Sequence, residues 1–307
     1  MKILVTGGAG FIGSHIADGF LNLGHEVCIV DNLSTGQMEN VHPNAAFYLM
    51  DIRAAELSKL FGKEKPDVLC HQAAQMDVRK SVADPMLDAD INIRGTLNLL
   101  QNCILHGVKK VLFASTGGAI YGEQEAFPCD ETHPLRPVSP YGVAKLSVER
   151  YLHFYQVEYG LSCSILRYAN IYGPRQNPKG EAGVVAIFAN KMLSGGQPVI
   201  NGDGGQTRDY TYVGDVVQAN LKCVERAENE VFNIGTGVET DVNQLFRMLN
   251  NLTGAGAEEK HGPALAGEQR RSVISHQKAK NALGWEPRMD LKSGLAETVA
   301  FFKERLG

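Results

Sequence analysis

The chain has 307 residues and a mass of 33.4 kDa, which is enough for one large α/β domain or two smaller ones. Its hydrophobic content of 44% is ordinary for a soluble globular protein, and a net charge of −4, with acids and bases interspersed, excludes a strongly basic surface for nucleic acid or anionic membranes. No apolar run approaches the roughly 20 residues of a membrane span, and the apolar residues 1–5 run directly into a glycine-rich turn, which indicates a strand rather than a signal peptide.

The first half of the chain alternates short apolar runs with amphipathic segments. We expect strands at residues 3–6, 27–30, 68–71, 111–114 and 162–166. We expect helices at about 11–23, 85–105 and 141–159, the last two ended by Gly107 and Gly160. Strands separated by helices predict βαβ units, a parallel sheet and right-handed crossovers, and therefore an α/β fold.

The second half is less regular. Residues 175–183 are rich in Gly, Pro and charge and are expected to form a loop, while residues 184–193 form an amphipathic helix. Strand-like residues 209–213, a helix to about 225 and a strand at 231–234 add material to the sheet, so we expect a second domain that interleaves with the first. Residues 238–307 are typical of helices joined by short loops.

A glycine-rich turn, Thr6-Gly7-Gly8-Ala9-Gly10-Phe11-Ile12-Gly13, lies between the first strand and the first helix. Its glycines allow a close approach to a pyrophosphate, and the helix N-terminus supplies N–H groups and a positive dipole. Asp31 ends the next strand, where a carboxylate accepts hydrogen bonds from ribose hydroxyls and repels a 2′-phosphate, which favours NAD over NADP. The alternative for Asp31 is a loop-initiating residue. For Asp51 we leave open a contact with the adenine edge and a solvated turn.

Tyr141 and Lys145 are one helical turn apart on the same face of a predicted helix. A tyrosine titrates near about pH 10, and a cation held close lowers that pKa by favouring the phenolate. Ser139 and Pro140 supply an N-cap and a first-turn proline, so the pair lies at the start of the helix. A surface pair on an amphipathic helix is the alternative, but the glycine turn and Asp31 upstream favour proton transfer in alcohol or ketone redox chemistry.

A third group is needed to hydrogen-bond the reacting oxygen. Ser115 and Thr116 follow the strand at 111–114, at the carboxyl end where ligands of α/β sheets bind, and capping is their alternative role. The six scattered cysteines form no C-x-x-C and are expected to be reduced, buried thiols. The nine histidines show no ligand spacing. We therefore expect a cytoplasmic protein without a metal.

Further ordered motifs accompany the turn and the Tyr/Lys pair: Asp31-Asn32, Asp51-Ile52, His71-Gln72-Ala73-Ala74, Asn92 before Gly95-Thr96, residues 115–122 and 166–170, Tyr172-Gly173-Pro174, Arg208-Asp209-Tyr210 and residues 233–237. On these motifs the whole chain resembles the extended short-chain dehydrogenase/reductases, and within them nucleotide-sugar epimerases of the UDP-glucose 4-epimerase type. The resemblance implies a Rossmann-like doubly wound parallel sheet with a smaller, interleaved C-terminal substrate domain. The NAD-binding domain would comprise residues 1–172 and about 209–237, and the substrate domain about 173–208 and 238–307.

The resemblance also implies roles for individual residues. Catalysis would fall to Tyr141, Lys145, Thr116 and Ser115. The cofactor NAD would be held by Gly7, Gly10, Phe11, Ile12, Gly13, Asp31, Asn32, Ser34, Thr35, Gly36, Asp51, Ile52, Gln72, Ala73, Ala74, Gln75, Asn92, Ser115, Tyr141, Lys145 and Tyr168. A UDP-sugar substrate would meet Thr116, Tyr141, Asn170, Val184, Arg208, Arg271 and Ser272. The helices at 85–105 and 141–159 match those that build a dimer interface in the family, so a homodimer is expected.

The implied reaction is reversible oxidation at the sugar C4, with Tyr141 taking the proton of the 4-hydroxyl, NAD taking and returning the hydride, and the 4-keto sugar turning over between the two transfers. Related 4,6-dehydratases carry an Asp-Glu pair, and decarboxylases a Glu, where this chain has residues 117–120, Gly-Gly-Ala-Ile. No acid or base stands there for elimination or for work at C5. The alternatives are a UDP-uronate 4-epimerase, a net nucleotide-sugar oxidoreductase, and a non-catalytic cofactor sensor that would lack Tyr141 or Lys145.

Three positions depart from the family pattern. Aligned without gaps, the catalytic Ser/Thr falls on Gly117, and we expect Thr116 to replace it, with Ser115 behind. A diphosphate arginine near the C-terminus is replaced by Leu265, for which Arg270 or Arg271 compensates unless they form a solvated basic pair. The position that closes the pocket against N-acetylated sugars falls on Ser272, whose small side chain predicts room for a 2-acetamido group.

Overall fold

A seven-stranded parallel sheet forms the centre of the molecule. The computed structural model describes residues 1–178, 183–226, 229–264 and 269–306. The strand order is β11-β6-β5-β4-β1-β2-β3, and every neighbouring pair is parallel. The strands are β1 (Lys2–Thr6), β2 (Glu26–Asp31), β3 (Ala46–Leu49), β4 (Val68–His71), β5 (Lys110–Thr116), β6 (Ser162–Tyr168) and β11 (Glu230–Ile234). The predicted α/β fold with a doubly wound parallel sheet is confirmed.

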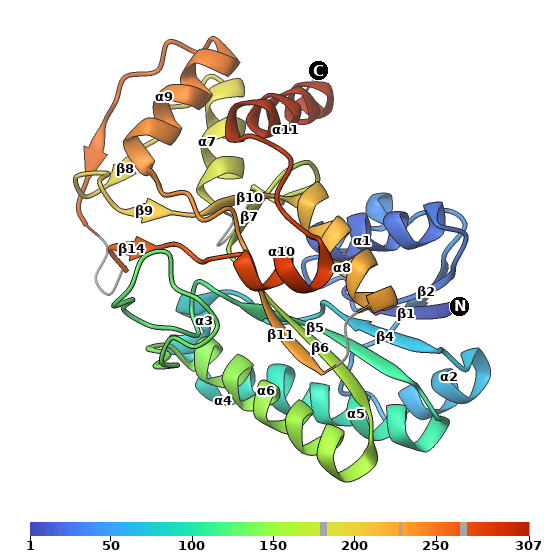
Figure 1. Ribbon diagram of the computed structural model, residues 1–307. Coiled ribbons are helices and arrows are strands. Elements are labelled where there is room, and N and C mark those ends of the chain that lie inside the picture. Colours follow the sequence, from blue (N-terminus) through green and yellow to red (C-terminus); the bar gives the residue numbers. More distant parts are fainter. Residues whose placement is uncertain (179–182, 227–228, 265–268, 307) are drawn as a thin grey trace.

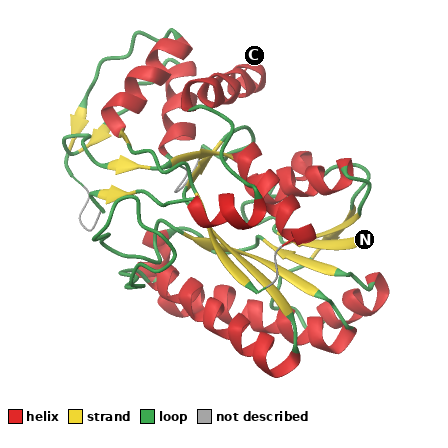
Figure 2. Cartoon of the chain, viewed as in Figure 1, coloured by secondary structure: helices red, strands yellow, loops and turns green. Residues whose placement is uncertain are grey.

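Helices cover both faces of this sheet (Figures 1 and 2). One face carries α1 (Phe11–Asn22), α8 (Val213–Arg226) and α10 (Gln277–Leu283); the other carries α2 (Leu57–Glu64), α3 (Val78–Ala83), α4 (Pro85–Ala89), α5 (Gly95–His106) and α6 (Pro140–Tyr159). Because successive strand residues point to opposite faces, Ile3 and Val5 join a first buried cluster with α1 and α8, whereas Leu4 joins a second with α2 and α5.

A second lobe stands beyond the carboxyl ends of the strands. Helices α7 (Val184–Leu193), α9 (Val242–Thr253) and α11 (Leu291–Leu306) pack around a third buried cluster. Short sheets tie this lobe together: β7 (Asn170–Tyr172) pairs with β10 (Tyr210–Tyr212), β8 (Ile200–Asn201) with β13 (His261–Gly262), and β9 (Thr207–Arg208) lies between β12 (Thr240–Asp241) and β14 (Arg271–Ser272). The carboxyl ends of the strands of the large sheet therefore face the second lobe (Figure 1).

Three elements differ from the sequence prediction. The predicted helix at 85–105 is α4 and α5 joined by a π-helical turn at Asp90–Arg94. Strand β5 continues through Ser115 and Thr116. Helix α10 and Trp285 pack in the first cluster, where the Trp285 indole N–H donates to the carbonyl of Asp215 at 2.9 Å, so residues 277–285 belong with the large sheet rather than with the substrate lobe. Among the described residues no helix is long and apolar enough to cross a membrane.

Candidate active site

The glycine turn after β1 has the backbone geometry of a phosphate-binding loop. Gly7 has φ +70°, and a Cβ there would lie 2.7 Å from the backbone N of Ala73. A Cβ on Gly13 would lie 2.2 Å from the carbonyl oxygen of Gly7. Helix α1 begins after Gly10, which has no side chain to cap the first-turn N–H groups, so those of Phe11 and Ile12 lack intrahelical partners. The turn is therefore a cradle that side chains would fill, open to an anion.

Asp31 links this turn to the next loop. Its buried carboxylate accepts the N–H of Ala9 at 3.0 Å and the N–H of Leu33 at 2.8 Å. A Cβ on Gly36 would lie 2.9 Å from the same carboxylate, so the loop closes over it. The side chain thus starts a loop and also faces the glycine turn, where a ribose would meet it. Residues Asn32, Ser34 and Thr35 are exposed on this loop.

Asp51 is bound by an arginine that the sequence prediction did not consider. The guanidinium of Arg53 makes two hydrogen bonds of 2.8 Å with its carboxylate, and the amide of Asn32 donates to it at 3.1 Å. These bonds hold the pKa of Asp51 well below its usual range. Ile52 is buried in the second cluster. Asp51 is therefore fixed beside the loop of Asn32 rather than in a freely solvated turn.

The segment after β4 is fixed at both ends. The N–H of Ala73 donates to the Thr6 hydroxyl at 3.3 Å, and the Asn92 side chain bonds the backbone N–H and carbonyl of Gln75, each at 2.9 Å. Ala73 and Ala74 therefore pass directly beside the glycine turn. Residues 72–75 are the segment for which the sequence predicts a cofactor role.

Two predicted cofactor residues direct their side chains elsewhere. The Tyr168 hydroxyl accepts a hydrogen bond from Asn220 Nδ2 at 2.8 Å and from Gln72 Nε2 at 3.3 Å. Tyr168 packs in the first cluster with α8 behind the sheet. The side chains of Gln72 and Tyr168 thus form an internal contact between β4, β6 and α8. The structure favours this internal role over a cofactor contact by these two side chains.

The Tyr141/Lys145 pair lies at the start of α6, as the sequence predicts. The Ser139 hydroxyl accepts the N–H of Gly142 at 3.2 Å, and Pro140 occupies the first turn. Lys145 is 3% exposed, donates from Nζ to the carbonyl of Ala114 at 2.8 Å, and lies 5.8 Å from the centre of the Tyr141 ring. The cap and the β5 carbonyl thus bring the pair to the end of β5.

The pKa values of this pair differ from the sequence prediction. Burial lowers the pKa of Lys145 to about 8, opposed by the negative charges of Asp88 and Glu149. Burial also raises the pKa of Tyr141, and the charge of Asp88 adds to this effect. In this structure burial and the charge of Asp88 therefore both disfavour the Tyr141 phenolate. A phenolate requires further positive charge in the site.

Ser115 and Thr116 have separate environments. The Ser115 hydroxyl donates to Glu149 Oε1 at 2.6 Å, inside a buried network that also holds Arg167. The Thr116 hydroxyl accepts the N–H of Ala119 at 3.1 Å. Because the Thr116 hydroxyl accepts from a backbone donor, it still has a proton to donate, whereas the hydroxyl proton of Ser115 is donated to a carboxylate.

Gly117 and Gly118 explain the departure at the family's Ser/Thr position. A Cβ on Gly117 would lie 2.6 Å from Ile274 Cδ1, so a side chain there would point into the interior of the molecule. A Cβ on Gly118 would lie 3.9 Å from the Thr116 hydroxyl and 4.0 Å from Asn170 Oδ1. Thr116 and Asn170 therefore flank an open position at Gly118, which favours Thr116 over residue 117 as the hydroxyl donor.

The predicted substrate residues divide between the two faces of the small sheet. Ser272 on β14 is paired in register with Arg208 on β9, and Arg271 with Thr207. Paired residues share a face and neighbours alternate, so Arg271 lies on the face opposite to Arg208. The Arg271 guanidinium is bound to Glu239 at 2.6 Å, and that of Arg270 to Asp203 at 2.7 Å. The structure thus places Arg271 in an exposed ion pair, on the face of this sheet opposite to Arg208.

The remaining substrate predictions lie around the second lobe. Val184 begins α7 and is half-buried there. Ser272 is 4% exposed. Leu265, the position of the missing diphosphate arginine, lies outside the described residues.

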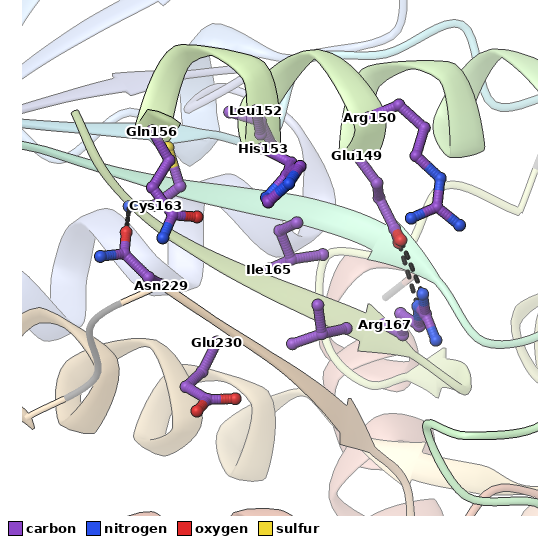
Figure 3. A pocket seen from close by; sticks show the side chains of 11 residues that line it. Glu149, Arg150, Leu152, His153, Gln156, Cys163, Ile165, Arg167, Asn229 and Glu230 are labelled. Atoms are coloured by element: carbon purple, nitrogen blue, oxygen red, sulfur yellow. Dashed lines mark hydrogen bonds and ion pairs between the residues drawn. The ribbon is translucent and has the colours of Figure 1, made fainter. Parts of the chain in front are cut away.

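A separate hollow lies between α6 and the strands β6 and β11, at the β11 edge of the sheet (Figure 3). It is lined by Glu149, Arg150, Leu152, His153, Gln156, Cys163, Ile165, Arg167, Asn229, Glu230 and Val231. Glu149 is about two helical turns from Tyr141, and the Glu149–Arg167 ion pair closes the inner wall at 2.7 Å. The hollow is thus distinct from the site at the strand ends.

Sequence reasoning missed two buried acids. Asp209 is 1% exposed and accepts hydrogen bonds from the N–H groups of Thr236 and Gly237, at 2.8 and 3.1 Å. Asp88 is also 1% exposed and lies on α4 beside the start of α6. The signal for Asp88 was its spacing of four residues from Asn92, which places both on one helix face.

Comparisons with known proteins identify the family. The model of the "NAD dependent epimerase/dehydratase family" matches residues 3–235. The chain is 48% identical to a "Putative UDP-glucose 4-epimerase" of Methanocaldococcus jannaschii over 98% of both chains. It is 52% identical to a crystal structure of UDP-glucose 4-epimerase with UDP-glucose from Thermotoga maritima, which covers 100% of both chains with a TM-score of 0.98.

A more distant solved structure is a UDP-N-acetylglucosamine 4-epimerase from Methanobrevibacter ruminantium, in complex with UDP-N-acetylmuramic acid. It is 35% identical, covers 99% of this chain and 98% of that chain, and has a TM-score of 0.94. The glycine turn, Asp31 and the Tyr141/Lys145 pair fit NAD, and the predicted cofactor is confirmed by the family. The chain belongs to the NAD-dependent epimerase/dehydratase family of extended short-chain dehydrogenase/reductases.

Proposed function

We propose that this enzyme interconverts UDP-glucose and UDP-galactose by transient oxidation at the sugar C4. The observation that carries the proposal is the Tyr141/Lys145 pair at the end of β5, at the same edge of the sheet as the glycine turn after β1, with no acid or base in residues 117–120. Relatives named as UDP-glucose 4-epimerases at 48% and 52% identity support this substrate.

The protein's own residues handle the proton. The Tyr141 oxygen, as phenolate, accepts the proton of the 4-hydroxyl as C4 is oxidised and returns it when C4 is reduced. Lys145 supplies part of the positive charge that stabilises the phenolate, and Thr116 donates a hydrogen bond to the reacting oxygen. NAD, when bound, supplies the hydride acceptor and donor.

The cofactor and the nucleotide are held by different lobes. The glycine turn, Asp31 and residues 73–75 would hold NAD, because a cradle for pyrophosphate and a carboxylate for ribose lie side by side there. Asn170, Arg208 and Ser272 would face the nucleotide sugar. Separate lobes allow the sugar to turn over while the cofactor stays in place.

The small side chain of Ser272 favours a second substrate pair. Ser272 shares a face with Arg208, so a sugar 2-acetamido group would meet a hydroxymethyl group rather than a bulky side chain. The M. ruminantium relative is a UDP-N-acetylglucosamine 4-epimerase. We therefore include UDP-GlcNAc and UDP-GalNAc as substrates.

We also propose a homodimer in the cytoplasm. Exposed apolar side chains gather on the outer helices that cover one face of the sheet: Met86 on α4, Leu105 on α5, and Val143, Tyr151, Phe154 and Val157 on α6. An apolar stripe of this kind favours a partner helix pair. All six cysteines are free and buried, which fits a reducing compartment.

A substrate panel tests the proposal. Purified protein receives UDP-galactose, UDP-GalNAc or UDP-galacturonate without added NADH, and the 4-epimer is followed by NMR. We expect turnover of UDP-galactose and UDP-GalNAc, because hydride is returned within each cycle. Turnover of UDP-galacturonate alone would favour the uronate epimerase, a requirement for added NADPH would favour a net oxidoreductase, and no turnover of any would refute the epimerase.

A further inference from the structure

Asp88 carries a buried carboxylate, and its two oxygens differ in their hydrogen bonds. Its Oδ1 accepts hydrogen bonds from Gln75 Nε2 at 2.9 Å and from Asn92 Nδ2 at 3.0 Å. Its Oδ2 is buried and finds no hydrogen-bond partner among the described residues. An ionised carboxylate in the interior is strongly unfavourable unless a positive charge compensates it. A cation close to Asp88 would supply this compensation.

Helix α4, which carries Asp88, packs against the first turns of α6 (Figure 1). The neighbouring helix α3 makes the same contact, with the Ser81 hydroxyl accepting the N–H of Tyr141 at 3.3 Å. Asp88 thus faces the end of α6 that carries Tyr141 and Lys145, and its charge acts on both side chains.

The buried charges on this side of the sheet can be assigned in pairs. Glu149 and Arg167 form an ion pair with bonds of 2.7 and 3.0 Å, and the hydroxyls of Ser115 and Tyr121 complete that network. Glu149 is therefore paired with Arg167, and its charge raises the pKa of Lys145 less than the charge of Asp88 does. Among the residues that the structure describes, the carboxylate of Asp88 and the ammonium of Lys145 are the buried charges that remain on this side of the sheet.

The other titratable groups that face Lys145 do not alter this balance. His71 on β4 is held by Thr6 and Thr96, and burial lowers its pKa to about 3, so it is neutral. Tyr141, on the same helix as Lys145, is neutral when protonated. The partly exposed Asp90 is bound by Arg53 and Arg94.

We propose that Asp88 is the counter-charge of Lys145, a positioning residue that keeps the lysine protonated so that it can stabilise the Tyr141 phenolate. Through Oδ1 the same carboxylate fixes Gln75 and Asn92, which ties the cofactor-side loop to the charge of the catalytic pair. The role of Asp88 in catalysis rests on the proposed function, whereas its effect on the charge of Lys145 does not.

The direct test is a titration of Lys145 in the purified full chain. Lysine labelled with ¹³C at Cε is followed by NMR as pH rises, and Lys145→Arg identifies the signal. The wild-type midpoint is expected near 8. Asp88→Asn keeps the acceptor for Gln75 and Asn92 but removes the charge, so the midpoint should fall by about half a unit or more. Asp84→Asn, an exposed acid on the same segment, should leave it unchanged.

Two variants whose side chains are one methylene longer provide a second test in case Asp88→Asn does not fold. Asp88→Glu should keep the midpoint and Asp88→Gln should lower it. If removal of the charge leaves the midpoint where it is, the proposal is wrong.

Activity supplies a second readout. In an active enzyme Asp88→Asn should move the alkaline limb of kcat against pH to lower pH by the same shift, whereas loss of a purely structural contact would reduce kcat without moving it. Absence of epimerase activity in the wild type would refute the proposed function, and the NMR titration would still decide the role of Asp88.

Discussion

At the scale of single residues, the adjacent hydroxyls of Ser115 and Thr116 have different roles. One belongs to a buried structural network, and the other is placed for the reaction. Ser115 and Thr116 both end β5, but Ser115 donates to Glu149 and Thr116 turns back to the N–H of Ala119. Since neighbouring strand residues point to opposite faces, only one of them can face the reacting oxygen. The structure favours Thr116.

The two hydroxyls should respond differently to removal. Thr116→Val should reduce kcat by about 100-fold, since it removes one hydrogen bond to the reacting oxygen. Ser115→Ala should leave kcat within about threefold but lower the free energy of unfolding by about 1–3 kcal/mol, because it leaves a buried carboxylate short of a donor. Steady-state kinetics and urea unfolding check both; the reverse pattern would exchange their roles.

Tyr141→Phe should reduce kcat by about 10²–10⁴-fold while NAD stays bound, because the proton acceptor is lost and the cofactor cradle is untouched. Tyr151→Phe, on the exposed side of the same helix, is the matched control and should behave as wild type. Bound NAD is measured after acid release. Undiminished turnover in Tyr141→Phe would remove this residue from its role.

The residues best predicted from sequence are those with a fixed local spacing. Tyr141, Lys145 and Asp31 were recognised because a helix start or a strand end places them. The orientations of Asp88 and Arg271 could not be predicted, because they depend on which way a short helix or a two-residue strand faces. That orientation is set by packing and register, which a single sequence does not carry.

At the scale of elements, the glycine turn and α1 form one unit. Gly13→Ala should lower NAD occupancy by at least about tenfold, since its Cβ would lie 2.2 Å from the Gly7 carbonyl and the turn must move. Gly62→Ala in α2, where the nearest atom is 3.4 Å away, is the control and should retain NAD. Equal NAD content in both variants would contradict the role of the turn.

Long elements were predicted more closely than short ones. Helix α7 was predicted at 184–193 and is observed there, and α6 differs from its prediction by one residue. The two-residue strands β9, β12 and β14, which position Arg208 and Ser272, have too few residues for a periodic pattern. They form because distant segments meet, so their pairing is a tertiary property.

At the scale of the whole molecule, the apolar stripe on α4, α5 and α6 predicts a dimer. The four apolar residues on α6 fall within an arc of about 120°. Phe154→Glu combined with Val157→Glu should give a monomer at micromolar concentration in light scattering or sedimentation. Leu23→Glu, exposed at the end of α1 on the other side of the sheet, should remain dimeric. A wild type that is monomeric at these concentrations would refute the dimer.

The assignment of segments to lobes also belongs to this scale. Helix α10 and Trp285 return to the large sheet after the chain has crossed the second lobe. An apolar helix and a tryptophan predict burial but not the core that receives them. The fold class could be predicted from the order of elements, whereas this late return could not.

The most direct test of the account follows deuterium placed at C4 of UDP-galactose. If C4 is oxidised and reduced within one turnover by hydride held on the cofactor, the UDP-glucose formed in H₂O should retain the deuterium at C4, and unlabelled substrate turned over in D₂O should gain none. Mass spectrometry and ¹H NMR of the product measure both. Exchange of the C4 label with solvent would contradict transient oxidation at C4.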